Sequence, residues 1–176
     1  MDVKYENHLD DKEGRWFAVH TKFRSEKAAV KRLEANGVEA YLPIKSVVRH
    51  YQRKIRKTEL PLISSFVFVR IVKTMYAKVL ETEYVAGFLK FGGNLLSIPD
   101  GQIELIKRLL GTEDLEMEVT QTAFYEGDEV EIDSGPLLGL RGKLVSIQGK
   151  ERVLVDLVNS GYSLQLIVDK KLLRRV

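Results

Sequence analysis

Apolar and polar residues alternate along the first two thirds of the chain in a way that predicts short strands separated by helices. The run 64–71 is the clearest case, because Phe66 and Phe68 fall on one face of a strand and Val67 and Val69 on the other. The predicted strands are 15–21, 38–43, 64–71 and 84–91, and the predicted helices are 25–36, 74–82 and a third that begins near Pro99. This βαββαβα order is that of an α/β plait, close to the ferredoxin-like arrangement.

Short signals mark the ends of these elements. Ser25 can cap the first helix, and Asn36-Gly37 is a signal that stops it. The chain is expected to turn at 92–94, Gly-Gly-Asn, after the fourth strand. The helix near Pro99 has an apolar stripe, formed by Ile103, Ile106 and Leu110.

The last third of the chain contains short strands only. Residues 112–122 carry four acids and no base, glycine or proline, and they predict a solvated linker. Beyond them, glycine turns separate four β-rich runs at the spacing of a small β-barrel. The expected fold class is α+β, with a polar N-terminal tail at 1–14, a plait domain at 15–111 that includes a basic hairpin insert at 45–60, a linker at 112–123 and a barrel at 124–176.

Composition limits the chemistry of the protein. The 176 residues are 44% hydrophobic and include no cysteine, which excludes a disulfide scaffold, an iron–sulfur cluster and a thiolate nucleophile. The net charge of +3 hides an asymmetry, because residues 1–110 hold 20 basic and 13 acidic side chains and residues 111–176 hold 8 and 12. The first part is therefore expected to meet an anionic partner. The N-terminus lacks the apolar core of a signal peptide and no run is long enough for a membrane span, so we expect a cytoplasmic protein without membrane contact.

The sequence offers no catalytic or metal-binding constellation. The three histidines lack the spacing of metal ligands. The segment 139–143, GLRGK, departs from the phosphate-loop signature at two positions. Glu129, Glu131 and Asp133 share one strand face, which we interpret as a solvated exterior rather than an acid/base pair. We expect no enzyme activity, no catalytic residue, no metal and no cofactor.

The segment 45–57, KSVVRHYQRKIRK, has six basic residues, one histidine and no acid. Its alternation, with Val48 and His50 against Arg49 and Tyr51, predicts a protruding β-hairpin between the second and third strands of the plait. The hairpin is either an arm that meets phosphates or a solvated loop. We favour the nucleic-acid arm because the first helix is also basic.

Phe66 and Phe68, with Trp16 on a neighbouring strand, have two interpretations. Aromatic residues at strand spacing are by default part of a core. One face of a plait's sheet, however, is not covered by its two helices, and aromatic side chains there would form an apolar binding platform. Burial of two Phe side chains contributes roughly 3 to 6 kcal/mol gross, enough to dominate a micromolar contact.

A glycine pattern near the C-terminus completes the set of motifs. It has the form G-D-x-V-x-I, G-P and G-x-x-G and is made by Gly127, Asp128, Val130, Ile132, Gly135, Pro136, Gly139 and Gly142. This pattern resembles the KOW motif. It follows WFAVHTKFRSEKAAVKRLE, LPLISSFVFVRI and GFLKFGG, which are similar in order and spacing to the N-terminal (NGN) domain of the NusG family of transcription elongation factors. The resemblance covers nearly the whole chain.

The resemblance implies an NGN-type plait followed by an SH3-like KOW barrel. In this family the plait binds the clamp helices of the largest RNA polymerase subunit through an apolar cleft, which suppresses pausing. On the matching positions the cleft would be lined by Trp16, Ile63, Phe66 and Phe68. Non-template or upstream DNA would contact basic residues on the first helix or at its start, namely Lys22, Arg24, Lys31 and Arg32. By our interpretation of the hairpin, the same DNA would also contact Arg49, Arg53, Lys54, Arg56 and Lys57. The barrel would recruit the termination factor Rho or a ribosomal small-subunit protein, and the factor would act as a monomer.

Departures from the family pattern point to a specialised member. Housekeeping members usually have P-G-Y where this chain has residues 64–66, Ser-Ser-Phe, and they lack so basic an insert as 45–57. Residues 161–166 also depart from the family's G-R-x-T-P-V-E-L segment. These differences argue against Rho and resemble the UpxY-like paralogues that antiterminate polysaccharide operons. The β-branched runs after residue 150 favour the barrel form of the last domain over a helical form.

Three alternatives remain at the level of sequence. A housekeeping NusG-type factor would share the plait and the barrel. A free RNA-binding module would use 66–71 as an aromatic RNP1 strand, although most of that motif's positions are replaced here. A ribosome-associated KOW protein would act in translation instead of transcription.

Overall fold

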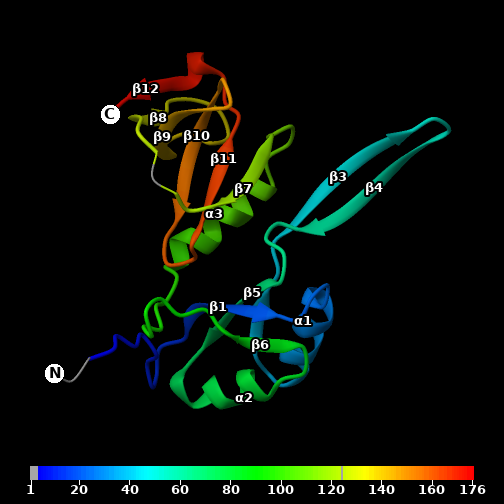
Figure 1. Cartoon of the computed structure of the whole chain (residues 1–176), viewed down its shortest axis with the longest axis vertical. Helices are drawn as coiled ribbons and strands as arrows, with labels where there is room; N and C mark the ends of the chain where they lie inside the picture. The colour runs from blue at the N-terminus through cyan, green and yellow to red at the C-terminus, as the bar shows by residue number, and fades with distance from the viewer. Residues whose placement is uncertain (1–3, 124) are drawn as a thin grey trace. The chain divides into compact units, whose positions relative to one another are not determined.

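A computed structural model describes residues 4–123 and 125–176 of the chain, which forms two compact units, Met1–Glu104 and Leu105–Val176 (Figure 1). Residues 1–3 of the predicted tail and Phe124, where the predicted barrel begins, lie outside the described residues.

The first unit is an α/β plait with a hairpin inserted into it. Its four-stranded antiparallel sheet has the order β2-β5-β1-β6, which is the ferredoxin-like order and confirms the predicted fold class. The elements are β1 (Arg15–Thr21), α1 (Glu26–Ala35), β2 (Glu39–Tyr41), β3 (Ile44–Tyr51), β4 (Lys54–Pro61), β5 (Phe66–Ile71), the 3₁₀ turn η1 (Lys73–Met75), α2 (Tyr76–Glu81) and β6 (Val85–Phe88). The helix α3 (Asp100–Leu110) contains the division between the two units.

One face of this sheet forms the core with α1 and α2. Val67 and Val69 of β5 pack in one buried cluster with Leu33 of α1 and Val79 of α2. Each of these side chains is completely or almost completely buried. Because side chains alternate along a strand, Phe66 and Phe68 lie on the opposite face, as the sequence pattern predicts.

The helix α1 begins and ends close to the positions that the sequence predicts, but one predicted contact at its start is absent. Ser25 is the residue before the helix, yet its hydroxyl donates to the carbonyl of Phe23 at 3.1 Å instead of accepting from a helix N–H. The predicted side-chain cap is therefore wrong. At the other end Gly37 has a φ of +76°, and the Asn36 amide donates to the Thr82 hydroxyl at 3.1 Å.

The predicted hairpin is present as a separate two-stranded sheet, β3 and β4, which projects from the plait (Figure 1). Its pairing runs from Ile44 opposite Pro61 to Tyr51 opposite Lys54, so a turn of two residues joins the strands. It is thus slightly longer than the insert 45–60 predicted from the sequence.

The segment before β1 is not the free polar tail that the sequence predicts. Asn7 makes a parallel bridge to Leu95, and the Leu95 N–H donates to the carbonyl of Glu6 at 2.9 Å. The His8 ring lies 3.0 Å (Nδ1) from the Ser97 hydroxyl, and Leu9 packs against the core cluster. One apolar side chain and several hydrogen bonds therefore attach this segment to the plait, although its composition is that of a polar tail.

The second unit is a six-stranded antiparallel sheet of order β12-β8-β9-β10-β11-β7. Its strands are β7 (Met117–Gln121), β8 (Asp128–Ile132), β9 (Arg141–Ile147), β10 (Lys150–Leu157), β11 (Tyr162–Leu166) and β12 (Leu173–Arg175), with the 3₁₀ turn η2 (Lys170–Leu172) before β12. We call this unit the β unit. It confirms the prediction that the last part of the chain is all-β.

Two predictions near the start of the β unit need correction. Residues 112–123 are not linker throughout, because Met117–Gln121 form β7 and pair with β11. Met117 is buried, and the acidic residues on either side of it masked an alternating strand pattern. In α3 the third buried position of the apolar stripe is Leu109, not Leu110.

Candidate functional site

Three of the four apolar residues expected to bind polymerase, Trp16, Phe66 and Phe68, lie on the face of the plait sheet away from α1 and α2. Ala18 is directly opposite Phe68 and His20 opposite Phe66 in the β1–β5 ladder, so Trp16, two residues before Ala18, shares their face. The rings of Phe66 and Phe68 meet edge to face with centroids 5.2 Å apart. Ile63, just before β5, is buried as well. We call Trp16, Ile63, Phe66 and Phe68 the aromatic face.

The aromatic face is closed in this structure. Trp16 is 6% exposed, Ile63 4%, Phe66 1% and Phe68 0%. The Tyr41 ring stacks on Phe68 at 6.4 Å between centroids. Burial, and then the negative charge of Glu104, raise the pKa of Tyr41 to about 12, so this hydroxyl is neutral at physiological pH.

The basic residues of the hairpin gather on both of its faces. Arg49 is directly opposite Arg56, and Tyr51 is opposite Lys54, on one face. On the other face Val48 is opposite Lys57, while Arg53 lies in the turn between the strands. Large apolar side chains of the hairpin are exposed among these charges, namely Val48 at 52%, Tyr51 at 50% and Ile55 at 69%.

The basic residues near α1 are exposed but are not equivalent. Arg32 forms an ion pair with Glu83, with Nε 3.2 Å from the carboxylate oxygen. Lys22 and Arg24 lie in the turn before the helix, and Lys31 lies on the helix itself. Lys27 lines a surface hollow of about 550 Å³ together with four residues of β4, which are Arg56, Lys57, Thr58 and Glu59. Residues of α1 and of the hairpin therefore line the same hollow.

Phe23 is a surface feature that the predicted site residues do not include. Its side chain is 79% exposed, and the Arg24 guanidinium carbon lies 5.1 Å from the centre of its ring. The available signal was the tripeptide Lys22-Phe23-Arg24, in which a large apolar residue lies between two bases just beyond the end of a strand.

The glycines of the KOW-like pattern have two different structural roles. Gly135 and Gly139 have φ values of +79° and +84°, which are strained for any other residue. Gly142 in β9 has no room for a side chain, because a Cβ there would lie 2.7 Å from the Leu154 carbonyl oxygen. The intervening Pro136 carbonyl accepts two bonds from Arg108 of α3, at 2.8 and 3.0 Å.

Asp128 begins β8, and Gly127 directly precedes it. The Asp128 carboxylate lies 2.9 Å from the Arg175 guanidinium of β12, the strand that pairs with β8. A Cβ at Gly127 would collide with the backbone of Leu144. The glycines of the KOW-like pattern therefore allow β8, β9 and β10 to approach closely, and they shape the turn between β8 and β9.

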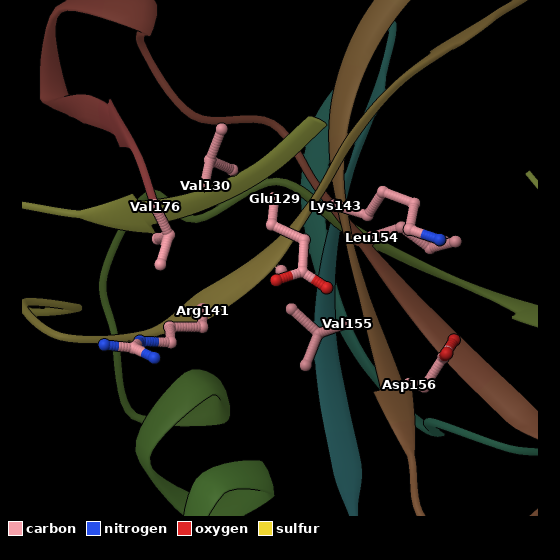
Figure 2. Close-up of a pocket in the computed structure, with 9 residues that line it drawn as sticks. Glu129, Val130, Arg141, Lys143, Leu154, Val155, Asp156 and Val176 are labelled. Atoms are coloured by element: carbon pink, nitrogen blue, oxygen red, sulfur yellow. The ribbon is translucent and has the colours of Figure 1, made fainter. Parts of the chain in front are cut away.

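A pocket of about 310 Å³ on the β unit is lined by both acidic and basic side chains (Figure 2). Figure 2 shows the Glu129 carboxylate reaching toward Val155, with Arg141 and Lys143 on either side.

Glu131, on the same strand as Glu129, accepts from Arg174 at 2.6 Å and from Arg141 at 2.7 Å. These hydrogen bonds, that from Arg174 first, hold the pKa of Glu131 below its usual range. A general acid requires the opposite shift, so this carboxylate is a fixed charge that joins β8, β9 and β12.

The described residues, 4–123 and 125–176, contain neither a candidate metal cluster nor a membrane-spanning helix. No group of three or more His, Cys, Asp or Glu side chains in these ranges could hold a metal ion. Within the same ranges, no helix is long and apolar enough to cross a membrane.

Comparison with known proteins identifies relatives of the whole chain. The family model described as transcription termination factor NusG matches residues 14–107. A solved structure described as "Domain interaction in Thermotoga maritima NusG" is 25% identical, with 93% of this chain and 98% of that chain covered and a TM-score of 0.56. A chain from the MjSpt4:Spt5 complex, conformation A, is 23% identical over 92% of this chain and 97% of that one, but its TM-score of 0.30 is too low to extend the comparison. Since the family model spans more than half of the sequence, the chain belongs to the NusG family of transcription factors.

Proposed function

We propose that the protein is a non-enzymatic, monomeric elongation factor that binds RNA polymerase through its aromatic face and reduces pausing or termination. The observation that carries the proposal is the Phe66–Phe68 pair on the sheet face that α1 and α2 do not use, in a chain that belongs to the NusG family. An apolar contact of this kind suits the clamp helices, since burying two Phe side chains in a partner contributes several kcal/mol, roughly 3 to 6 gross. The protein would act in the cytoplasm, where its polymerase is.

The burial of this face sets a condition on the mechanism. The four side chains are at most 6% exposed, so the residues that cover them must move before a partner can bind. The apparent affinity is then reduced by the fraction of molecules in which the face is uncovered. Binding is therefore expected to be weaker than the apolar area alone would give.

Nucleic acid is the second proposed partner. The hairpin bases and those near α1 would contact non-template or upstream DNA, since Lys27, Arg56 and Lys57 line one hollow. Exposed cations that outnumber acids favour phosphate over a solvated surface: the hairpin segment 45–57 contains no acid, and the hollow holds three bases and one acid, Glu59.

The β unit would recruit a second protein, for which a ribosomal small-subunit protein is preferred to Rho. The mixed-charge pocket of Figure 2 supports a protein partner there. The proposed finer role is antitermination of polysaccharide operons by a UpxY-like paralogue. It rests on the hairpin and on Ser64-Ser65-Phe66, where the backbone of Ser65 has a φ of +56°.

The test is retention of core RNA polymerase by the immobilised full-length protein. The variant Phe66→Leu/Phe68→Leu keeps the face apolar but removes both rings, and milder changes than alanine are needed because both side chains are buried. We expect the unchanged protein to retain polymerase and this variant to lose most of the retention.

The matched control is Val67→Ala/Val69→Ala on the same strand. These residues face the core with α1 and α2, so the control loses stability without changing the aromatic face. Circular dichroism shows whether each variant is folded. A folded Phe variant that binds normally contradicts the assigned face, and an unchanged protein that retains no polymerase contradicts the proposed function.

A further inference from the structure

Three strained backbone positions converge where β1 ends. Arg24, Ser65 and Tyr84 have positive φ values of 53°, 56° and 71°, a region that residues other than glycine rarely adopt. The Thr21 N–H donates to the carbonyl of Ser65 at 3.0 Å, and the Lys22 N–H donates to that of Tyr84 at 2.9 Å. Strain of this kind persists only where neighbouring contacts impose it, and it concentrates at functional sites.

The strained residues hold the turn 22–25 in one conformation. The Ser25 N–H donates to the Lys22 carbonyl at 3.1 Å and closes the turn. On its helix side the Glu26 carboxylate, 8% exposed, accepts from the Ser65 N–H at 2.8 Å. Phe23 and Arg24 therefore form the apex of a turn that is anchored at both ends.

The apex presents an aromatic ring to solvent. Phe23 is the most exposed large apolar side chain among the described residues, at 79%. The neighbouring guanidinium, 5.1 Å from the ring centre, adds a cation–π contact that restricts the ring. A fixed, exposed ring loses little conformational freedom when a second flat group stacks on it.

The surroundings of the ring are positively charged. Lys22, Arg24 and Lys27 are exposed, and none of the three forms an ion pair with another described residue. The one acid in this stretch, Glu26, is buried and turned toward Ser65. Lys27 also lines the hollow that reaches the hairpin bases Arg56 and Lys57, where these three bases outnumber the one acid, Glu59, so the positive charge continues away from the ring.

We propose that Phe23 is a stacking platform for one unpaired base of a single-stranded nucleic acid whose phosphates lie against Lys22, Arg24 and Lys27. An aromatic ring beside a track of cations is the combination by which proteins bind single strands without reading their sequence. This inference rests on the nucleic-acid contact in the proposed function and adds the residue that selects unpaired over paired bases. An apolar patch of a protein is the competing occupant that the experiment must exclude.

The test is equilibrium binding of the full-length protein to short oligonucleotides that carry one 2-aminopurine, whose fluorescence falls when the base stacks. Single-stranded DNA, the same sequence as RNA, and duplex DNA are compared. We expect quenching with the single strands and not with the duplex. Phe23→Leu, which stays apolar but cannot stack, is expected to weaken single-strand binding roughly tenfold. Phe23→Trp, which still offers a ring for stacking, is expected to bind single strands as the unchanged protein does. Phe91→Leu, a change at another exposed Phe, is the matched control.

Salt dependence separates the ring from the charges. Lys22→Ala should reduce the log–log salt slope by about 0.7, the value for one lost phosphate contact on a single strand, whereas Phe23→Leu should lower the affinity at every salt concentration without changing the slope. The DNA and RNA arms show which single strand is preferred.

Three results would overturn the inference. The first is no binding at about 100 µM protein, the weak end of non-specific affinities. The second is equal binding by Phe23→Leu and the unchanged protein. The third is loss of polymerase retention by Phe23→Leu with unchanged oligonucleotide binding, which would assign the ring to a protein contact. Normal polymerase retention in the first two cases would leave the proposed function intact.

Discussion

Arg49 and Arg56 lie directly opposite each other on one face of the hairpin formed by β3 and β4. Like charges in this position destabilise a strand pair, by an amount on the order of 0.2 to 1 kcal/mol. An isolated two-stranded hairpin has little stability to lose. The pair therefore weakens the hairpin in the free protein, and an anionic partner between the two guanidinium groups would remove the repulsion.

Replacing both arginines in an Arg49→Thr/Arg56→Thr variant should separate stability from binding. Hydrogen exchange of the hairpin amides should become slower, because the repulsion is gone and Thr favours strands. Binding to single-stranded nucleic acid should weaken, and its log–log salt slope should fall by about 1.4, or roughly 0.7 for each lost phosphate contact.

The control for this variant is Lys150→Thr/Lys171→Thr, which removes two exposed positive charges from the β unit. It has the same effect on net charge, so it corrects for the general attraction of a basic protein to nucleic acid. An unchanged slope in the hairpin variant, or an equal change in the control, would show that the hairpin does not contact phosphate.

Tyr41 provides a pH-dependent test of the arrangement beside the aromatic face. Its pKa is raised to about 12 by burial and by Glu104, whereas an unfolded tyrosine ionises near 10. Between these values the unfolded chain loses the proton first, so the contribution of Tyr41 to stability is complete below pH 10 and is lost as the pH rises toward 12.

The tyrosinate absorbance of the unchanged protein should therefore contain one late step near pH 12 that is missing in Tyr41→Phe. Glu104→Gln should move this step to lower pH, because the negative charge that disfavours the phenolate is gone. Tyr51→Phe, in the exposed hairpin, is the control and should leave the late step in place. A late step that survives in Tyr41→Phe would contradict the assignment.

The pattern of apolar residues is sufficient to predict the plait but not what covers it. Val67 and Val69 alternate strictly with Phe66 and Phe68, and the structure confirms the two faces of β5. Whether the Phe pair is open to solvent depends on contacts between segments far apart in the chain. No local period records such contacts, so the closure of the aromatic face was not predictable.

Other differences have local causes. Strand β7 was missed because Glu116 and Glu118 flank the buried Met117, and an edge strand with one polar side resembles a linker in composition. Arg24, next to the exposed Phe23, has a positive φ that residue propensities do not favour, so the conformation of this turn could not be read from the sequence. The pairing of Arg49 with Arg56 depends on the position of the hairpin turn.

Glu131 should control the acid stability of the β unit. Because its pKa is lowered by the hydrogen bonds from Arg174 and Arg141, its contribution is present above the ordinary value of 4.5 and is lost as the pH falls through the lower value of the folded state. Glu131→Gln should lower the Tm at neutral pH and make the Tm of the β unit less dependent on pH below 4.5. Thermal unfolding followed by circular dichroism at several pH values checks this.

The double variant Arg141→Gln/Arg174→Gln removes both donors from Glu131 and should reproduce the weaker pH dependence. Because the carboxylate then lacks its partners, the loss of Tm at neutral pH should be at least as large as in Glu131→Gln. An acid transition that is the same in the unchanged protein and in Glu131→Gln would mean that other carboxylates control acid unfolding.

Two glycines of the KOW-like pattern should respond differently to alanine. In Gly142→Ala the new methyl group would lie 2.7 Å from the Leu154 carbonyl oxygen, so β9 and β10 must separate, at a cost of roughly 1 to 3 kcal/mol. In Gly139→Ala the methyl group meets no atom within 4 Å, and only the positive φ of 84° opposes it, at about 1 kcal/mol. Denaturant unfolding measures both, and a β unit more sensitive to Gly139→Ala than to Gly142→Ala would contradict the close approach of the two strands.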